Sequence, residues 1–206
     1  MSFDFFLKGI ALGLAIAAPV GPIGVLCIRK TLEFGRLSGL FSGLGAACAD
    51  TIYAVIAAFG LTIIANFLLE EHFWFRLAGG LFLLYLGWKT FSAMPNPQTK
   101  NLSHTTLIND FFSTFFLTLT NPMTILAFLA VFASLGLSDI EGDYIQAGEL
   151  VCGVFLGSAL WWLILSEGVT LFRKKISQET MEWINRTAGT IIMGFGIITL
   201  LSLLSV

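Results

Sequence analysis

Charged residues are scarce in this chain: Asp, Glu, Lys and Arg together make up 12% of its 206 residues. A soluble domain normally devotes about a quarter of its residues to these four types. The deficit arises because long apolar runs are separated by short polar stretches, which is the pattern of an integral membrane protein. The composition therefore excludes an ordinary soluble domain.

Cysteine and histidine are also few, and the net charge is small. The three cysteines, Cys27, Cys48 and Cys152, lie in apolar surroundings, so we predict no disulfide framework. The net charge of −2 gives no support for a nucleic-acid partner. The two histidines lie in loops, and the sequence contains no metal-ligand cluster, catalytic triad or phosphate-cradling loop. We therefore expect no cofactor, no metal and no enzymatic activity.

What the sequence does contain is enough apolar length for six membrane spans. A helix needs about 20 mostly apolar residues to cross the hydrocarbon core. We expect the first run to be a retained span, because the segment before it lacks the basic region of a signal peptide. The predicted organisation is a three-helix unit over 1–92, a cytoplasmic linker over 93–110 and a second unit over 111–206. The spans cover roughly 5–28, 37–65, 73–92, 111–136, 147–170 and 185–205.

Basic residues predict how these spans are oriented. Cytoplasmic loops are enriched in Lys and Arg, and nine of the eleven basic residues fall on one side, in the first, third and fifth loops. The fourth loop, LSDIEGDYIQAGE, has no Lys or Arg at all. We therefore predict that both termini face outward.

The two units share a sequence pattern in matching order. The third span begins RLAGGLFLLYLG and the sixth RTAGTIIMGFG, while the first and fourth carry prolines in PVGP and LTNPMT. Because each unit has three spans, the second copy must be inverted, as in many secondary transporters. The predicted fold is an all-α integral membrane protein: six transmembrane helices as two inverted three-helix repeats, with proline-broken first and fourth helices. Small residues spaced by four predict close helix packing at Gly39, Gly43, Gly153 and Gly157.

Asp50 is the strongest candidate for a functional residue. It lies about 13 residues into the second span, hence roughly 20 Å from the cytoplasmic edge. An ionisable group at that depth costs at least about 2.5–3.5 kcal/mol and usually faces a bundle interior or a wet path. We predict that Asp50 carries a proton or acts as counter-charge for a cationic substrate group. The alternative is a structural acid bonded to a neighbouring helix.

Prolines interrupt two of the predicted spans. Pro19 and Pro22, with Gly21 between them, make a severe break in the first span, and Asn121–Pro122 makes a milder one in the fourth. Proline removes a backbone N–H and frees a carbonyl of the preceding turn, and in hydrocarbon such groups need partners from protein or a wet cavity. We predict that the breaks line a substrate or ion pathway, where carbonyls suit a cation and N–H groups suit a carboxylate. A kink that serves only helix packing is the alternative.

Other residues within the spans have a structural and a functional interpretation. Trp161 and Trp162 fall near mid-membrane, where an indole N–H needs a partner; they either line the pathway or fill packing and lipid-facing space. Ser158 has no intramembrane His or Lys as a base, which argues against an intramembrane protease. We expect Glu167, near the cytoplasmic end of the fifth span, to cap that helix or to pair with Lys174.

Five stretches of the sequence resemble the lysine-exporter (LysE/RhtB) family of translocators, and the likeness covers essentially the whole chain. They are APVGPIG, SGLGAACAD, RLAGGLFLLYLGWKTF, FFSTFFLTLTNPMTILAFLAVF and GVFLGSALWWLILS, from the first five spans in order. The resemblance implies an exporter of amino acids or related small solutes in the bacterial inner membrane. It also implies coupling to protons and a homodimer, and it makes the outward termini periplasmic.

The resemblance assigns residues by position. Met123 departs from it, because family members often have lysine there, and Ile23 stands where many members have a polar residue. Both departures affect groups that could distinguish substrates. The positions that match the family's motifs are Pro19, Gly21, Pro22, Asp50, Asn121 and Pro122.

Three other functions stay open beside proton-coupled amino-acid export. A metal or inorganic-ion permease is the nearest rival, although Asp50 is the only clearly deep acid and a divalent cation needs several oxygen or sulfur ligands. A membrane thiol–disulfide carrier would use Cys27 and Cys48, but these lie at depths that differ by roughly 15 Å or more. A purely structural interaction module would not need Asp50.

Overall fold

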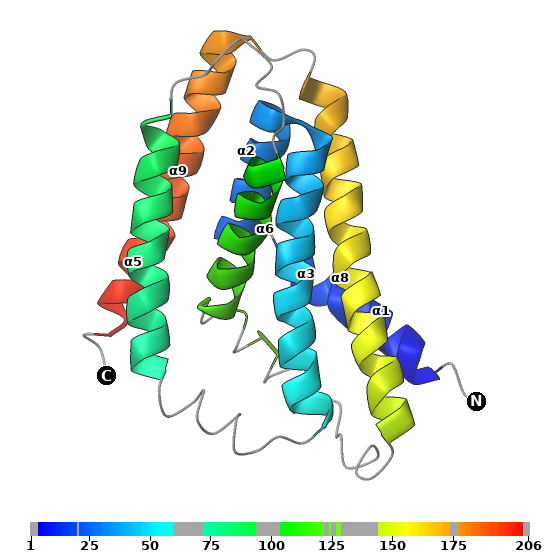
Figure 1. Ribbon diagram of the computed structural model, residues 1–206. Helices are drawn as coiled ribbons and strands as arrows, with labels where there is room; N and C mark the ends of the chain where they lie inside the picture. The colour runs from blue at the N-terminus through cyan, green and yellow to red at the C-terminus, as the bar shows by residue number, and fades with distance from the viewer. Residues whose placement is uncertain are drawn as a thin grey trace.

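The computed structural model describes residues 4–19, 21–59, 72–93, 104–121, 124, 127–128, 144–173 and 177–203. Every regular element in these ranges is a helix (Figure 1). The prediction of an all-helical protein is therefore confirmed for the described residues. The helices are α1 (Asp4–Ala17), α2 (Pro22–Phe34), α3 (Arg36–Ala58), α5 (His72–Phe91), α6 (His104–Leu119), α8 (Tyr144–Arg173) and α9 (Gln178–Leu201).

Three of the described helices are long and apolar enough to cross a membrane: α3, α9, and α8 over Tyr144–Phe172. A fourth span results if α1 and α2 count as one bent segment, and α6 contributes a shorter apolar helix over Thr106–Leu119. Large apolar side chains such as Trp74, Trp88 and Leu171 are exposed. Exposed apolar area of this kind marks a surface that contacts lipid or another protein.

The first predicted span consists of two helices at a steep angle. α1 ends at Ala17 and α2 begins at Pro22, and their axes differ by 82°. In Figure 1, α1 enters obliquely from the lower end of the bundle, and α2 continues toward the upper end. Gly21 precedes α2 in an extended conformation. Pro22 then fits the first helical turn, because an N–H at that position has no acceptor within the helix.

Several helix boundaries differ from the sequence prediction. α6 begins at His104 and not at residue 111, and α9 begins at Gln178 and not at residue 185. α8 extends from Tyr144 to Arg173, beyond the predicted 147–170, and α2 continues to Phe34, beyond the predicted end at residue 28. The discrepancy has a physical cause: apolar content marks the part of a helix that lies in lipid, whereas the helix itself continues through polar residues. In α6 the polar first turns include Asp110, which is buried and bonded to other helices.

Glycines allow α1 and α8 to approach until their backbones touch. A Cβ added at Gly153 would lie 2.3 Å from the carbonyl oxygen of Phe6, and one at Gly157 would lie 2.2 Å from that of Ile10. α3 packs on α6 in the same manner, because a Cβ at Gly45 would lie 2.2 Å from a carbonyl oxygen of α6. Close approach through small residues is a common way for membrane helices to associate.

The glycines of α3 that face α2 and α8 make room for side chains. A Cβ at Gly43 would lie 2.3 Å from Cβ of Trp162, and one at Gly39 would lie 2.0 Å from Oγ1 of Thr31. Trp162 is 4% exposed and belongs to a core cluster that also contains Leu26 and Leu117. Gly43 therefore fixes how closely the indole of Trp162 can lie against α3, which matters for the cavity beside it.

Candidate functional site

A cavity of about 280 Å³ lies beside the break between α1 and α2. Residues of α1, α2, α3, α8 and α9 line it, together with residues of α6 and of the stretch that follows α6. Its volume lies just below the roughly 300–1,000 Å³ typical of ligand pockets. Its lining is mostly apolar, with polar groups from Asp50, Thr118, Asn121 and Thr124. A small solute with a few hydrogen-bonding groups matches this size and composition.

The cavity brings together most of the residues that the sequence singles out as a pathway. Trp161 is an exception: it does not line the cavity, and it packs half-buried against the core. Pro122 and Met123 lie outside the described residues. The role of each residue as part of a pathway remains a prediction. Those that line the cavity are Pro19, Gly21, Pro22, Asp50, Asn121 and Trp162.

Asp50 is 3% exposed and lies on α3. The hydroxyl of Ser158, on α8, donates a hydrogen bond of 2.7 Å to Oδ2 of Asp50. Within the described residues Asp50 makes no ion pair, and this is its single hydrogen bond. The carboxyl is therefore balanced by a neutral hydroxyl and not by a cation. Such a group can hold a proton or accept a cationic group of a solute.

One wall of the cavity is polar because Thr118 lies at the end of α6 and Asn121 and Thr124 follow that helix. Thr118 donates to the carbonyl oxygen of Thr114 at 2.9 Å, which satisfies its hydroxyl within the helix. Asn121 Nδ2 donates to Thr124 Oγ1 at 3.0 Å. These bonds hold the side chains in place and leave a lone pair on the hydroxyl oxygens of Thr118 and Thr124, because a hydroxyl oxygen carries two. The wall can therefore still accept hydrogen bonds from a solute.

The N-terminus of α2 forms part of another wall. Gly21, Pro22, Ile23 and Gly24 all line the cavity. Within the described part of the chain no side chain caps this helix end, and a Cβ placed on Gly21 would meet nothing within 4 Å. The first N–H groups of a helix have no acceptor within it and carry its positive dipole end. The wall therefore presents backbone donors beside open space.

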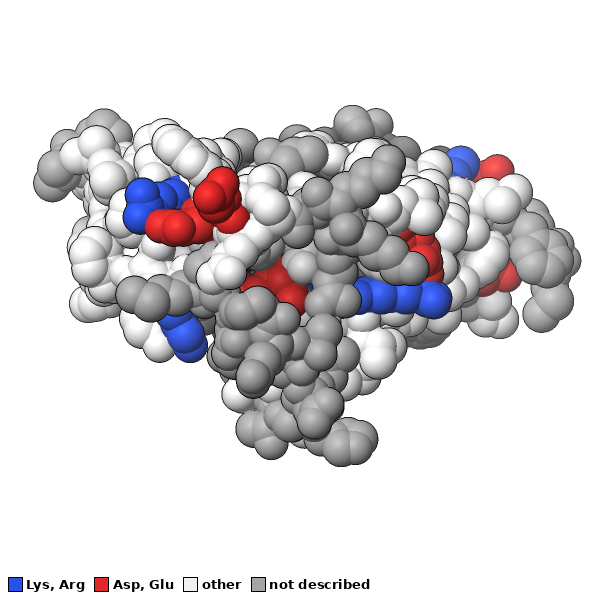
Figure 2. Space-filling view, turned by 90° about the horizontal axis from the view of Figure 1, so that it is seen from above, with Lys and Arg blue, Asp and Glu red and all other residues white. Residues whose placement is uncertain are grey.

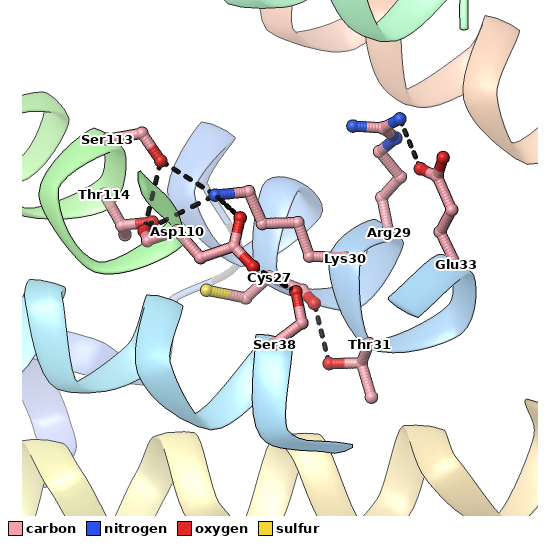
Figure 3. Close-up of polar contacts among 9 residues, drawn as sticks. All are labelled: Cys27, Arg29, Lys30, Thr31, Glu33, Ser38, Asp110, Ser113 and Thr114. Carbon is pink, nitrogen blue, oxygen red and sulfur yellow. Dashed lines mark hydrogen bonds and ion pairs between the residues drawn. The ribbon is translucent and has the colours of Figure 1, made fainter. Parts of the chain in front are cut away.

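A second polar cluster, which the sequence analysis missed, lies toward the other end of α2 (Figure 3). Lys30 Nζ lies 3.0 Å from Asp110 Oδ1 and donates to Ser113 Oγ at 2.8 Å. Ser38 Oγ donates to the other carboxylate oxygen, Oδ2 of Asp110, at 2.5 Å. The side chains of Lys30 and Asp110 are 8% and 9% exposed. The cluster joins α2, α3 and α6 through one buried ion pair.

Arg29 points away from that cluster and bonds to different elements. It pairs with Glu33 one turn later, and its Nε donates to Asn185 Oδ1 at 3.0 Å. Asn185 in turn donates to the carbonyl oxygen of Ala93 at 3.1 Å. Arg29 thus connects α2 to α9 and, through Asn185, to the residues just after α5. The sequence gives little indication of these bonding partners, because a polar residue close to the end of a predicted span is ordinarily solvated.

Glu167 has a partner that the sequence analysis did not name. Glu167 Oε1 lies 2.5 Å from Nε of Arg36, so its partner is the first residue of α3. Lys174 lies outside the described residues. Figure 2, which views the bundle from above, shows Lys and Arg atoms beside Asp and Glu atoms on this end. Glu167 therefore connects α8 to the start of α3 through an ion pair.

The described residues contain no group of three or more His, Cys, Asp or Glu side chains placed to hold a metal ion. The three cysteines are free: Cys27 is buried, Cys48 is half-buried and Cys152 is exposed. Cys27 and Cys48 do not line the cavity. Its chemistry therefore rests on oxygen and nitrogen groups.

The fold and the cavity together define a helical membrane protein that encloses a small, partly polar site within its bundle. The chain belongs to the LysE type translocators, whose family model matches residues 14–203. This membership confirms the resemblance seen in the sequence motifs. It makes the protein a transporter of small molecules and not an enzyme.

Several curated relatives match over nearly their full length. The chain is 29% identical to the putative amino acid efflux protein YcgF of Bacillus subtilis (strain 168), with 94% of this chain and 93% of the relative covered. It is 25% identical to the threonine efflux protein of Salmonella typhimurium, with 98% and 100% covered, and 25% identical to that of Escherichia coli (strain K12), with 91% and 93% covered. No solved structure is significantly similar to the chain.

Proposed function

We propose that the protein exports amino acids from the cell and that the cavity beside the α1–α2 break binds them. Membership of the LysE type translocators supports export, and relatives named for amino acid and threonine efflux support the substrate class. The observation that carries the proposal is Asp50: a buried carboxyl, bonded to a neutral hydroxyl, in a cavity whose described lining residues include no Lys or Arg. The α-ammonium group of an amino acid can serve as the cation that pairs with Asp50.

The test is export by cells that carry the wild type or Asp50→Asn. Cells are loaded with labelled amino acids, threonine first, and efflux is followed with time. We expect Asp50→Asn to lower efflux at least about tenfold, because losing a buried charge partner is worth 1.4 kcal/mol or more. Equal amounts of both proteins in the membrane must be verified.

Asp4→Asn is the matched control, because Asp4 is exposed and pairs with Lys8 on the surface of α1. This variant should export at the wild-type rate. Full export by Asp50→Asn would remove Asp50 from the mechanism. Failure of the wild type to export any amino acid would contradict the proposed function itself.

We further propose that export is coupled to protons, with Asp50 as the carrier. A carboxyl that alternates between protonation and a bond to an ammonium group exchanges one proton for one solute. The neutral partner Ser158 supports this role, because it can bond to either protonation state. An uncoupler that collapses the proton gradient should stop wild-type export against a concentration gradient. Unchanged uphill export would exclude proton coupling.

We propose two inverted three-helix repeats as the basis of the mechanism. α1 packs on α8, and α6 packs on α3, which is the pairing expected if the first half exchanges with the second. α1 ends at Ala17 just before Pro19, and α6 ends at Leu119 just before Asn121. Inverted repeats with broken helices allow one half to rock against the other around a central site.

Location, orientation and assembly complete the proposal. We infer a multi-pass protein of the bacterial inner membrane with periplasmic termini, because most basic residues fall on one side of the spans. Tags at each terminus should be accessible from outside the inner membrane, and a cytoplasmic C-terminus would contradict this orientation. A homodimer is part of the proposal, and cross-linking in native membranes tests it.

A further inference from the structure

We propose that Trp162 and the N-terminus of α2 form a subsite for the carboxylate of the transported solute. The inference rests on the proposed function and deepens it by assigning the two charged ends of an amino acid to different walls. The carboxylate lies at α2 and Trp162, and the ammonium group at Asp50. All of these residues line the same cavity.

Trp162 carries a donor that the protein itself leaves unused. Its side chain is 4% exposed, and its Nε1 is buried without a hydrogen-bond partner among the described residues. Buried indole N–H groups usually find an acceptor, since an unpaired polar group in a buried site is costly. A residue needed only to fill space beside Gly43 could be phenylalanine. An acceptor on the solute accounts for the tryptophan.

The N-terminus of α2 supplies further donors. No side chain among the described residues caps it, and Pro22 at its start has no N–H to compete for a ligand. The backbone N–H groups of Ile23 and Gly24 lie in the first turn, where a helix offers no internal acceptor. Gly21 leaves open space in front of them, because a Cβ there would meet nothing within 4 Å. Uncapped helix N-termini bind carboxylates in this way.

We expect neutral donors, and not side-chain cations, to hold the carboxylate in this cavity. Among the described residues that line it there is no Lys or Arg, so no side-chain cation there draws the carboxylate away from the backbone and indole donors. Asp50 repels a carboxylate and attracts an ammonium group, which orients a zwitterion with its carboxylate away from Asp50. The site therefore selects a solute with a free α-carboxylate and discriminates against the corresponding amide.

The experiment measures efflux of threonine and of threonine amide from cells with the wild type, Trp162→Phe or Trp161→Phe. Wild type should export threonine and discriminate against the amide. Trp162→Phe keeps the ring that packs on Gly43 but removes the N–H. It should raise the half-saturating threonine concentration about tenfold, with a smaller effect on the maximal rate. Trp161→Phe is the control, because Trp161 does not line the cavity.

A second pair of variants tests the helix end independently. Gly21 has an extended backbone that alanine adopts without strain, so Gly21→Ala adds a methyl group in front of α2 and should also raise the half-saturating concentration. Gly168→Ala is its control, because a Cβ there also meets nothing within 4 Å and Gly168 does not line the cavity.

Each outcome bears on a different claim. If Trp162→Phe and Gly21→Ala both export threonine like the wild type while Asp50→Asn does not, the carboxylate subsite is wrong and the proposed function survives. Equal export of threonine and its amide by the wild type also overturns the subsite. If the wild type exports no amino acid, both proposals fail.

Discussion

Asp50 and Ser158 belong to different helices, and the bond between their side chains is the one direct polar link between α3 and α8 at the cavity among the described residues. The hydroxyl fixes one carboxylate oxygen and leaves the other to a proton or a solute. Ser158 is 0% exposed, and it cannot act as a nucleophile here without a base. Its bond to Asp50 explains why a serine is buried at this position. Its role follows from its partner.

We expect Ser158→Ala to lower threonine efflux about tenfold without loss of protein from the membrane, because a hydrogen bond to a carboxylate is worth roughly 1.5–3 kcal/mol. Efflux rates measured alongside membrane abundance give the result. Ser166→Ala removes another buried hydroxyl of α8 away from the cavity and serves as control. If both variants behave alike, the Ser158 bond has no special part in transport.

Individual residues differ in how far the sequence reveals them. Asp50 and Asn121 stand out because polar groups are rare in long apolar runs, and both line the cavity. Ser158 and Thr118 do not stand out, since serine and threonine satisfy their hydroxyls within any membrane helix. Trp161 and Trp162 look equivalent in sequence, and only the packing of α8 against α3 distinguishes them.

At the scale of helices, α2 connects two polar regions. Its N-terminus lines the cavity, and its later turns carry Lys30, which pairs with Asp110 of α6. The sequence does not predict this pair, because Lys30 and Asp110 both fall at expected span boundaries and their helices are far apart along the chain. Apolar length predicts that helices exist, whereas their contacts depend on tertiary packing. The start of α6 lies earlier than the apolar run predicts, because the helix continues through polar residues.

Breaking the Lys30–Asp110 pair should loosen the junction of α2, α3 and α6. Asp110→Asn leaves the Lys30 ammonium buried without its counter-charge, which costs about 3–5 kcal/mol in buried pairs. Thermal denaturation of the detergent-solubilised protein should show a clearly lower midpoint. Replacing both partners by apolar residues, Lys30→Met with Asp110→Leu, should recover much of the loss.

The comparison of single and double variants separates a charge effect from a packing effect. Glu182→Gln is the control, since Glu182 pairs with Arg186 on an exposed face of α9. Exposed pairs contribute only about 0–1 kcal/mol, so its midpoint should barely move. An Asp110→Asn protein as stable as Glu182→Gln would mean that the buried pair does not hold the helices together.

At the scale of the whole molecule, the cavity adjoins helices from both halves of the chain, where α1 packs on α8 and α3 packs on α6. A transporter must expose one such site to each side of the membrane in turn. The bound solute should therefore shield residues of the cavity from reagents, whichever side they come from. Residues on the outer face of the bundle should not be shielded.

This shielding can be measured with cysteine labelling. Asn121→Cys, in a protein with Cys27 and Cys48 replaced by alanine, puts one thiol in the cavity and keeps exposed Cys152 as an internal control. Threonine should slow the reaction of Cys at position 121 with a membrane-permeant thiol reagent, because the solute occupies the space that the reagent must enter. It should leave labelling of Cys152 unchanged. Equal protection at both sites would indicate a global change, and no protection at position 121 would mean that the solute binds elsewhere. Export by this protein would also exclude a thiol–disulfide carrier that uses Cys27 and Cys48, because both thiols are absent.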